Sequence, residues 1–223
     1  MRAKLSVVMP TLDAGPALAR SLPALTEGLQ AGLIRELVIS DGGSTDDTLE
    51  IAEMSGAVVL RGAASRGGQL RRGAEAAQGE WLLFLHADTV LPEGWAGAVL
   101  AHLATGNPAC FRLRFDARGL APRLVAGWAN LRTRLFHLPY GDQALLISAS
   151  DYRATGGYDD IPLMEDVAMA RKLGRSLVCL PLRVATSAAR YEREGWLRRG
   201  AGNLLRLLRY LLGADPARLA RRY

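Results

Sequence analysis

The sequence predicts an α/β protein of one domain, in which helices flank a doubly wound, mostly parallel sheet. Short apolar runs alternate along the chain with segments of helical periodicity, the order expected of parallel strands joined by helices. The chain is 49% hydrophobic and contains 24 glycines, which suits many tight strand-to-helix turns. Its 223 residues lie near the upper end of the size of a single domain.

Apolar runs locate the strands, and apolar residues at helical spacing locate the helices. The first two runs end at Pro10 and Asp41, where the chain must turn. We expect strands at residues 5–9, 36–40, 57–60, 81–85, 109–115 and 144–147. We expect helices at residues 16–33, 45–55, 68–77, 120–136 and 167–173, with Ser44 or Thr45 capping the second of them.

Polar loops follow several of the predicted strands. In doubly wound sheets, ligands bind beyond the carboxyl ends of the strands. The loops at residues 10–13, 41–44 and 86–89, together with the region of Arg66, therefore predict one binding surface.

Charge and cysteine content limit the class of protein. The formal charge of +6, much of it after Arg183, fits phosphate-rich partners but does not choose between nucleotides, nucleic acid and an anionic membrane. Cys110 and Cys179 lie outside any disulfide or zinc spacing, which favours a reducing compartment. No apolar run approaches the roughly 20 residues of a membrane span, and the first run reaches Pro10 too soon for a secretory signal. We expect a cytoplasmic protein, peripheral to the inner face of the membrane if its tail binds lipid.

The end of the chain predicts a basic amphipathic helix in a tail of residues 196–223, after a globular domain of residues 1–195. One stripe at helical spacing contains Leu197, Ala201, Leu204, Leu205, Leu208, Leu211 and Leu212. The arginines largely opposite are Arg198, Arg199, Arg206 and Arg209. The helix is expected either to pack on its own domain or on a second subunit of a homodimer, or to lie on an anionic membrane.

Two carboxylates follow predicted strands and are candidates for ligand binding. Asp41 opens a glycine-containing loop, in which Gly43 allows the backbone to approach a ligand while Asp41 accepts hydrogen bonds from a ribose or base. A tight turn is the alternative. Asp88 follows a rigid strand and suits Mg²⁺ or Mn²⁺, which commonly use one or two protein carboxylates and substrate phosphate oxygens. It could instead cap a turn, and His86 is a metal ligand, a diphosphate contact or a packed residue.

A second acidic pair and a basic segment complete the candidates. Glu165 and Asp166 precede a predicted helix, where they either cap it or supply the base that an attacking hydroxyl needs. Backbone N–H groups and guanidinium groups near a helix start can hold a diphosphate. The residues of this kind are Arg66, Gln69, Arg71 and Arg72. The chain has no GxxxxGK[ST] loop and no GxGxxG after its first strand, which argues against the usual ATPases and dinucleotide dehydrogenases.

Four segments in order resemble family 2 glycosyltransferases of the GT-A fold, a Rossmann-like doubly wound sheet. They are Pro10-Thr11-Leu12-Asp13, Asp41-Gly42-Gly43-Ser44-Thr45-Asp46-Asp47-Thr48, Leu85-His86-Ala87-Asp88-Thr89 and Met164-Glu165-Asp166. A small bacterial subgroup, the radical-SAM/selenodomain-associated or arsenosugar-biosynthesis type, is similar in Gln69-Leu70, His86-Ala87-Asp88, Tyr140-Gly141-Asp142-Gln143 and the segment 160–166. The resemblance spans about residues 4–195.

The resemblance implies an inverting transfer of a sugar, of the hexosyltransferase type, from a nucleotide-diphosphate donor to an unidentified hydroxyl acceptor. A UDP-sugar is the leading donor, with guanosine and thymidine donors as alternatives. Asp88 would hold the divalent metal, Mn²⁺ or Mg²⁺. Asp166 would be the catalytic base, with Glu165 beside it. The donor site would comprise Pro10, Thr11, Asp13, Asp41, Gly43, Arg66, Gln69, His86, Ala87 and Asp142.

Two departures from the family pattern leave details open. His86 replaces the first carboxylate of the usual DxD, which affects metal affinity, and Arg71 stands where a small polar residue is expected, which affects donor choice. A nucleotidyltransferase is an alternative, although residues 10–16 contain no lysine or arginine for a phosphate loop. A non-catalytic protein that binds nucleotide-sugars is another, and the presence of both Asp88 and Asp166 argues against it. No nucleic-acid partner is expected.

Overall fold

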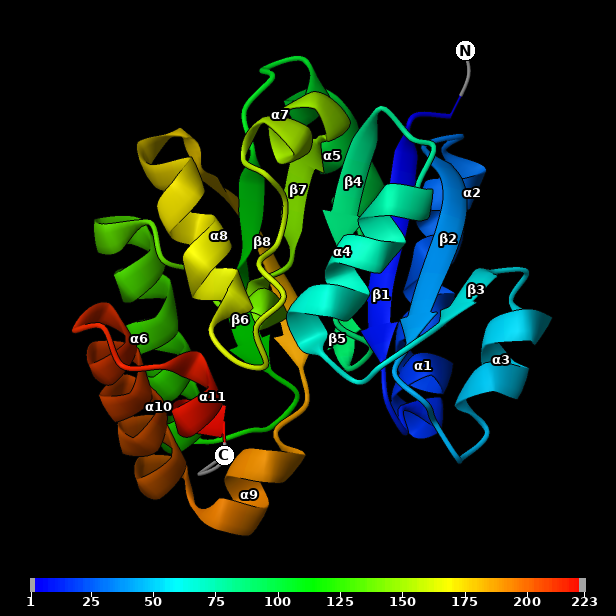
Figure 1. The fold of residues 1–223 in the computed structure, drawn as a ribbon. Helices are drawn as coiled ribbons and strands as arrows, with labels where there is room; N and C mark the ends of the chain where they lie inside the picture. Colours follow the sequence, from blue (N-terminus) through cyan, green and yellow to red (C-terminus); the bar gives the residue numbers. More distant parts are fainter. Residues whose placement is uncertain (1–2, 221–223) are drawn as a thin grey trace.

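The structure is a computed structural model that describes residues 3–220. Its centre is an eight-stranded sheet with the order β3-β2-β1-β4-β7-β6-β8-β5 (Figure 1). The strands are β1 (Leu5–Thr11), β2 (Ile34–Asp41), β3 (Val58–Arg61), β4 (Trp81–Phe84), β5 (Thr89–Val90), β6 (Ala109–Phe115), β7 (Leu145–Ser148) and β8 (Val178–Thr186).

Helices cover both faces of this sheet (Figure 1). The α-helices are α1 (Gly15–Ser21), α2 (Thr26–Gln30), α3 (Thr48–Met54), α4 (Arg66–Ala76), α5 (Trp95–Leu103), α6 (Leu120–Phe136), α7 (Ala149–Ala154), α8 (Glu165–Leu173), α9 (Ala189–Glu194), α10 (Trp196–Leu211) and α11 (Pro216–Ala220). Short 3₁₀ helices are η1 (Leu22–Leu25), η2 (Gly141–Gln143) and η3 (Gly174–Ser176). The predicted fold class is confirmed.

The sheet divides into a parallel half and a mixed half. Strands β3, β2, β1 and β4 run parallel, whereas β7 runs antiparallel to both β4 and β6. Residues that alternate along one strand feed the two opposite cores. On β1, Val7 and Met9 join the core that contains Trp95 of α5, while Val8 joins the core that contains Leu70 of α4. This alternation is why the continuous apolar runs become strands buried on both faces.

Two strands differ from the sequence prediction, since β5 and β8 were not expected. Pro181 lies within β8, and the β6–β8 register shifts between Cys110 and Arg112, which lies opposite Arg183. A proline supplies no N–H to a ladder, so the irregularity lets the strand continue past it. The register also makes Cys110 and Cys179 neighbours across β6 and β8, where both remain free thiols.

Two helix predictions were wrong in detail. The helix expected at residues 16–33 is broken into α1, η1 and α2, because Pro23 lies in the 3₁₀ turn between them. The helix expected at 45–55 begins only at Thr48, and neither Ser44 nor Thr45 caps it. The Ser44 hydroxyl donates to Asp41 instead.

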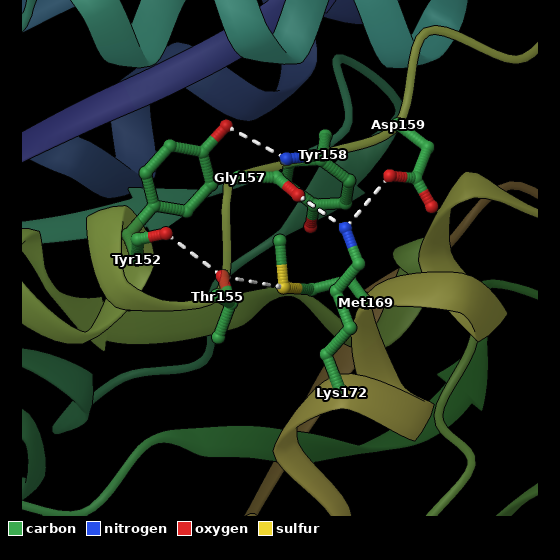
Figure 2. A network of polar contacts seen from close by, with 7 residues as sticks. All are labelled: Tyr152, Thr155, Gly157, Tyr158, Asp159, Met169 and Lys172. Atoms are coloured by element: carbon green, nitrogen blue, oxygen red, sulfur yellow. Dashed lines mark hydrogen bonds and ion pairs between the residues drawn. The ribbon is translucent and has the colours of Figure 1, made fainter.

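A polar network holds the loop that precedes α8 (Figure 2). The Lys172 ammonium donates to the carbonyl oxygen of Gly157 at 2.8 Å and to Oδ1 of Asp159 at 2.7 Å. On the other side, the Tyr158 N–H donates to the Tyr152 hydroxyl at 3.1 Å. Because this loop leads directly into Glu165 and Asp166, the network fixes the approach of the chain to the candidate site.

We expect the Gly67→Ala substitution to disturb this loop. A Cβ at Gly67 would lie 2.0 Å from the carbonyl oxygen of Asp159, and a backbone atom cannot move aside cheaply. The free energy of unfolding should fall by about 1–3 kcal/mol, measured by urea denaturation. The matched control is Gly97→Ala in α5, where nothing lies within 4 Å of the added carbon and alanine should stabilise the helix slightly. Equal stability of the two variants would contradict the close contact.

The described part of the C-terminal tail packs on the domain, but not through the predicted stripe. Leu207 of α10 lies in a small core with Leu163, Met164 and Val167. Arg199, which was expected opposite the packed face, is buried and donates to both carboxylate oxygens of Glu194 at 2.8 Å. Most leucines of the stripe are instead exposed, although Leu204 is half-buried. Their exposed fractions are 84% for Leu197, 49% for Leu205, 48% for Leu208, 41% for Leu211 and 88% for Leu212. The boundary at residue 196 stays a prediction.

Candidate active site

A cleft of about 940 Å³ opens at the carboxyl ends of β1 and β4. Its walls come from the loop after β1, the start of α4, the loop after β4, η2, the start of α8, and helices α9 and α10. Segments from the whole length of the chain therefore meet at one place, the edge of the sheet that the sequence predicts.

The loop after β1 supplies one wall. Pro10, Thr11 and Asp13 line the cleft as predicted. Asp13 adopts a left-handed conformation with φ of 46°, and its Oδ1 accepts a hydrogen bond from the N–H of Thr45 at 2.8 Å. Its own N–H donates to the Ser44 hydroxyl at 2.9 Å. The loops after β1 and β2 are thereby fastened to each other.

Asp41 and Gly43 lie outside the lining of the cleft. Asp41 is fully buried, and its carboxylate accepts hydrogen bonds from Thr11 Oγ1 and from the N–H groups of Gly43 and Ser44 at 2.8–2.9 Å. Burial alone would raise the pKa of Asp41, but the hydrogen bonds from Ser44, Gly43 and Thr11 outweigh it and lower the pKa. In this structure Asp41 orders the loop, and its contact with a base or ribose stays a prediction.

Only part of the predicted basic segment reaches the cleft. Arg66 and Gln69 line it, and the Gln69 amide donates to the carbonyl oxygens of Thr11 and Ser40. Arg71 and Arg72 do not line the cleft, and their contact with a diphosphate stays a prediction. Arg71 pairs with Glu75 one helical turn away, while Arg72 donates to the Ser40 hydroxyl and to the Asp41 carbonyl oxygen.

The segment after β4 brings His86, Ala87 and Asp88 into the cleft. Burial, followed by the charges of Arg66 and Arg190, lowers the pKa of His86 to about 3. The imidazole is therefore neutral at pH 7. It lies against η2, since a Cβ at Gly141 would be 2.4 Å from Nε2 of His86. Burial raises the pKa of Asp88, although Arg190 and Arg66 oppose the shift.

Three more carboxylates line the cleft, those of Asp142, Glu165 and Asp166. Glu165 is 1% exposed, and neither of its carboxylate oxygens has a hydrogen-bond partner. Its contact with Arg66 is a long one, 3.7 Å from Nε to Oε1. Asp142 also has a buried oxygen, Oδ1, without a partner. By contrast, Asp166 accepts from the N–H of Gly141 at 2.7 Å and from its neighbour Val167 at 2.6 Å. Hydrogen bonds thus hold Asp166 in place, whereas Oδ1 of Asp142 and both carboxylate oxygens of Glu165 have no hydrogen-bond partner.

The charge of Asp166 contributes to raising the pKa of both Asp142 and Glu165. Burial, opposed by Arg132 and reinforced by Asp166 and Asp88, raises the pKa of Asp142 to about 7. Burial and the charge of Asp166 raise the pKa of Glu165 to about 8. Asp142, which has an unpartnered buried oxygen and interacts electrostatically with Asp88, fits a site that receives a cation. Within residues 3–220, however, no group of three or more His, Cys, Asp or Glu side chains forms a metal site by itself. The remaining ligands would have to come from substrate and water, as Mg²⁺ commonly has them.

We expect the Glu165→Gln substitution to stabilise the protein at high pH. A carboxyl group with a raised folded pKa favours its protonated form, so its stabilising effect is present below the unfolded pKa and is lost as pH rises through the folded value. The melting temperature should rise by about 3–6 °C at pH 9 and change little at pH 4, measured with chelator and without nucleotide. The exposed Glu93→Gln is the control. A lower melting temperature for Glu165→Gln at pH 9 would show that the ionised carboxylate is stabilised.

Some cleft residues were not predicted. Arg190 of α9 acts on both His86 and Asp88, but the sequence showed it only as part of the basic tail. Tyr140 lines the cleft, and the Arg132 guanidinium lies 3.5 Å from the centroid of its ring. In the sequence, only its place in the Tyr140-Gly141-Asp142-Gln143 motif indicated that Tyr140 belongs to the site. The position of Arg190 depends on β8, which the sequence did not reveal.

The fold and site define a protein of the GT-A glycosyltransferase type, and comparison with known proteins gives the family. Residues 6–139 match Glycosyl transferase family 2, and the chain belongs to that family. PGL/p-HBAD biosynthesis glycosyltransferases of Mycobacterium tuberculosis and Mycobacterium bovis are 35% identical over 95 residues. This match covers 40% of the chain and 36% of each relative, so the chain spans about a third of their length in the match.

Solved structures share the fold at low sequence identity. S. aureus TarS 1-349, in complex with UDP-GlcNAc, has a TM-score of 0.62 and 15% identity, and the match covers 82% of this chain and 58% of the TarS 1-349 chain. Glucosyl-3-phosphoglycerate synthase from Mycobacterium tuberculosis, in complex with Mn²⁺, UDP and glucosyl-3-phosphoglycerate, has a TM-score of 0.60 and 22% identity. That match covers 91% of this chain and 79% of the synthase.

Proposed function

We propose that this protein transfers a hexose from a nucleotide-diphosphate donor, a UDP-sugar, to a hydroxyl acceptor with inversion at the anomeric carbon. One observation carries the proposal. Asp88, in the loop after β4, and Asp166, at the start of α8, line the same cleft. A cleft of about 940 Å³ is large enough for a donor and part of an acceptor. The donor classes named for the structural neighbours, UDP-GlcNAc and UDP with Mn²⁺, support a uridine nucleotide.

We propose a separate role for each group of residues that lines the cleft. Pro10, Thr11 and Asp13 would contact the nucleoside, and Arg66 would contact the diphosphate. Asp88 would hold Mn²⁺ or Mg²⁺ together with diphosphate oxygens, and this cation supplies electrostatic stabilisation of the departing charge. The unpartnered oxygen of Asp142 lies close enough to Asp88 for the two to interact electrostatically, and Asp142 is proposed to border the donor sugar or the acceptor.

The chemical step needs a base on the side of the acceptor. The acceptor oxygen forms a bond to the anomeric carbon while its proton passes to Asp166. The bond from that carbon to the diphosphate oxygen breaks, and its electron pair leaves with the nucleotide diphosphate. Asp166 suits this role because two N–H groups fix its carboxylate at the rigid start of a helix.

Calorimetric titration of UDP, GDP and dTDP, with Mn²⁺ and with chelator, tests the donor class. We expect metal-dependent binding of UDP and slow release of UDP from a UDP-sugar without acceptor. Binding of another nucleotide would reassign the donor, and binding without any donor turnover would favour a non-catalytic protein. Absence of binding to all three would overturn the proposal.

The finer classification stays a proposal. Membership in the arsenosugar-type subgroup rests on Gln69-Leu70, His86-Ala87-Asp88, Tyr140-Gly141-Asp142-Gln143 and the segment 160–166. Residues of these segments line the same cleft, which supports treating them together as one subgroup motif. A cytoplasmic location is proposed as well, and no helix within residues 3–220 is both long and apolar enough to cross a membrane.

A further inference from the structure

Helix α6 exposes a row of large apolar side chains on its outer surface. These are Leu120, Leu124, Trp128, Leu131 and Leu135, which are 45–77% exposed. Spacings of three and four residues place all five on one side of the helix. Such a row on a helix normally faces the core, but the core-facing side of α6 is a different one, formed by Pro122, Ala126 and Ala129.

Helix α10 lies beside α6 (Figure 1). It exposes a second apolar row, which contains Leu197, Leu205, Leu208 and Leu211. The helices approach closely near Gly200, where an added Cβ would lie 3.8 Å from Cγ2 of Val125. Successive residues of an α-helix are about 100° apart around its axis. Trp128 therefore lies about 60° around α6 from Val125. In the same way, Leu197 lies about 60° around α10 from Gly200. Because Trp128 and Leu197 are both exposed, the two rows border the outer side of this contact and form one continuous apolar face.

Arginines mark both outer edges of this face. Arg123 and Arg134 are exposed on α6 beyond its apolar row, and Arg198 and Arg209 are exposed on α10 beyond the other row. Neither helix contains an aspartate or glutamate. A surface with apolar residues in the middle and cations on both edges is the pattern of a helix that lies in a membrane interface.

We propose that α6 and α10 together dock the protein on an anionic lipid membrane. The leucines and Trp128 would enter the boundary between headgroups and acyl chains, and the four arginines would contact lipid phosphates. A second copy of the chain fits this face less well. In a two-fold dimer the face would meet itself, and eight arginines would share an interface to which neither helix contributes an acid.

Docking would bring the candidate active site close to the lipid headgroups. The opposite side of α10 carries Asn203 and Arg206, both of which line the cleft. One helix therefore separates the cleft from the proposed membrane surface. This placement also means that deletion of α10 would damage the cleft, so the test must use point substitutions on the exposed side.

Vesicle sedimentation of the full-length protein tests the proposal. We expect binding to vesicles of phosphatidylcholine with about one-third phosphatidylglycerol, weaker binding to phosphatidylcholine alone, and a further decrease at high salt. The Trp128→Ser/Leu208→Ser variant should lose about tenfold or more in its partition coefficient onto anionic vesicles. The Arg134→Gln/Arg209→Gln variant should lose affinity for anionic vesicles but not for neutral ones.

The matched control is Met54→Ser/Leu100→Ser, which removes two exposed apolar side chains of α3 and α5. It should bind vesicles like the unchanged protein, and all variants should keep the melting temperature because the altered side chains are exposed. The proposal is overturned if the unchanged protein stays in the supernatant with anionic vesicles, or if the control loses as much binding as Trp128→Ser/Leu208→Ser. Analytical ultracentrifugation tests the remaining outcome. If the unchanged protein does not bind vesicles but is a dimer, and the Trp128→Ser/Leu208→Ser variant is a monomer, the face belongs to an interface with a second copy.

Discussion

Replacing Asp166 with asparagine is expected to lower kcat for sugar transfer by about 10²–10⁴-fold and to leave nucleotide affinity nearly unchanged. Asparagine has almost the same shape but cannot accept the proton of the attacking hydroxyl. The carboxylate lies at the start of α8, where the N–H groups of Gly141 and Val167 hold it at 2.7 Å and 2.6 Å. The rate of nucleotide release with acceptor, measured by a coupled assay, reports the change.

Two controls separate this chemical role from a structural one. The amide oxygen of asparagine can keep one of the two hydrogen bonds, so the melting temperature of Asp166→Asn should fall only slightly. Glu165→Gln, next to it in the chain, should keep substantially more activity than Asp166→Asn if Asp166 is the base. Full activity of Asp166→Asn would rule out the assigned base and direct attention to Glu165 and Asp142, whose raised pKa values allow proton exchange near neutral pH.

Until an acceptor is known, donor hydrolysis gives a second readout for Asp166→Asn. Water would replace the acceptor hydroxyl and would need the same base, so hydrolysis should fall with transfer. Binding of UDP, measured by calorimetry, should stay within about twofold of the unchanged protein. A loss of binding instead would show that Asp166 supports the donor site.

The parallel half of the fold was predictable because its strands are continuous apolar runs. The run at residues 5–9 became β1, buried on both faces, and polar residues at its end marked the edge of the sheet. Strand β8 could not be found this way, since Pro181 and Arg183 break its alternation and it is defined by its pairing with β6 and β5. The long helix expected at 16–33 failed for the opposite reason. Its periodicity was correct, but Pro23 forces a 3₁₀ turn within it.

The site was predictable where a strand delivers a residue to the edge of the sheet. Asp88 follows β4 and lies in the cleft, and the helix start that carries Glu165 and Asp166 meets it there. Arg190 was not predictable, because it reaches the cleft only through β8 and α9. Sequence spacing also did not show that the carboxylate of Asp41 is occupied by hydrogen bonds from its own loop.

The orientation of α10 shows where periodicity alone is insufficient. A stripe of leucines normally predicts the buried side of a helix, yet here most of the stripe is exposed. The buried side contains Arg199, which is compensated by Glu194 and stacks near Tyr191 at 5.3 Å from its ring centroid. A charged residue can thus lie on the inner side when a partner from the preceding helix neutralises it.

Replacing Asp88 with alanine is expected to reduce Mn²⁺-dependent UDP affinity by about 10–100-fold, to the level that the unchanged protein shows with chelator. Asp88 is the only carboxylate in the His86-Ala87-Asp88 segment, because histidine replaces the first acid of the usual motif. The pKa of His86 is lowered to about 3, so its imidazole is neutral at pH 7 and does not repel a cation. Calorimetric titration of UDP with and without Mn²⁺ measures the change.

A matched loss of charge distinguishes metal binding from a general electrostatic effect. Glu93→Ala removes an exposed carboxylate that does not line the cleft, and its UDP affinity should equal that of the unchanged protein. Without metal, Asp88→Ala should bind UDP as well as or better than the unchanged protein, because a negative charge near the diphosphate is gone. If Mn²⁺ increases UDP affinity equally in Asp88→Ala and in the unchanged protein, the cation is held elsewhere. Asp142, with its unpartnered buried oxygen, is then the next carboxylate to replace.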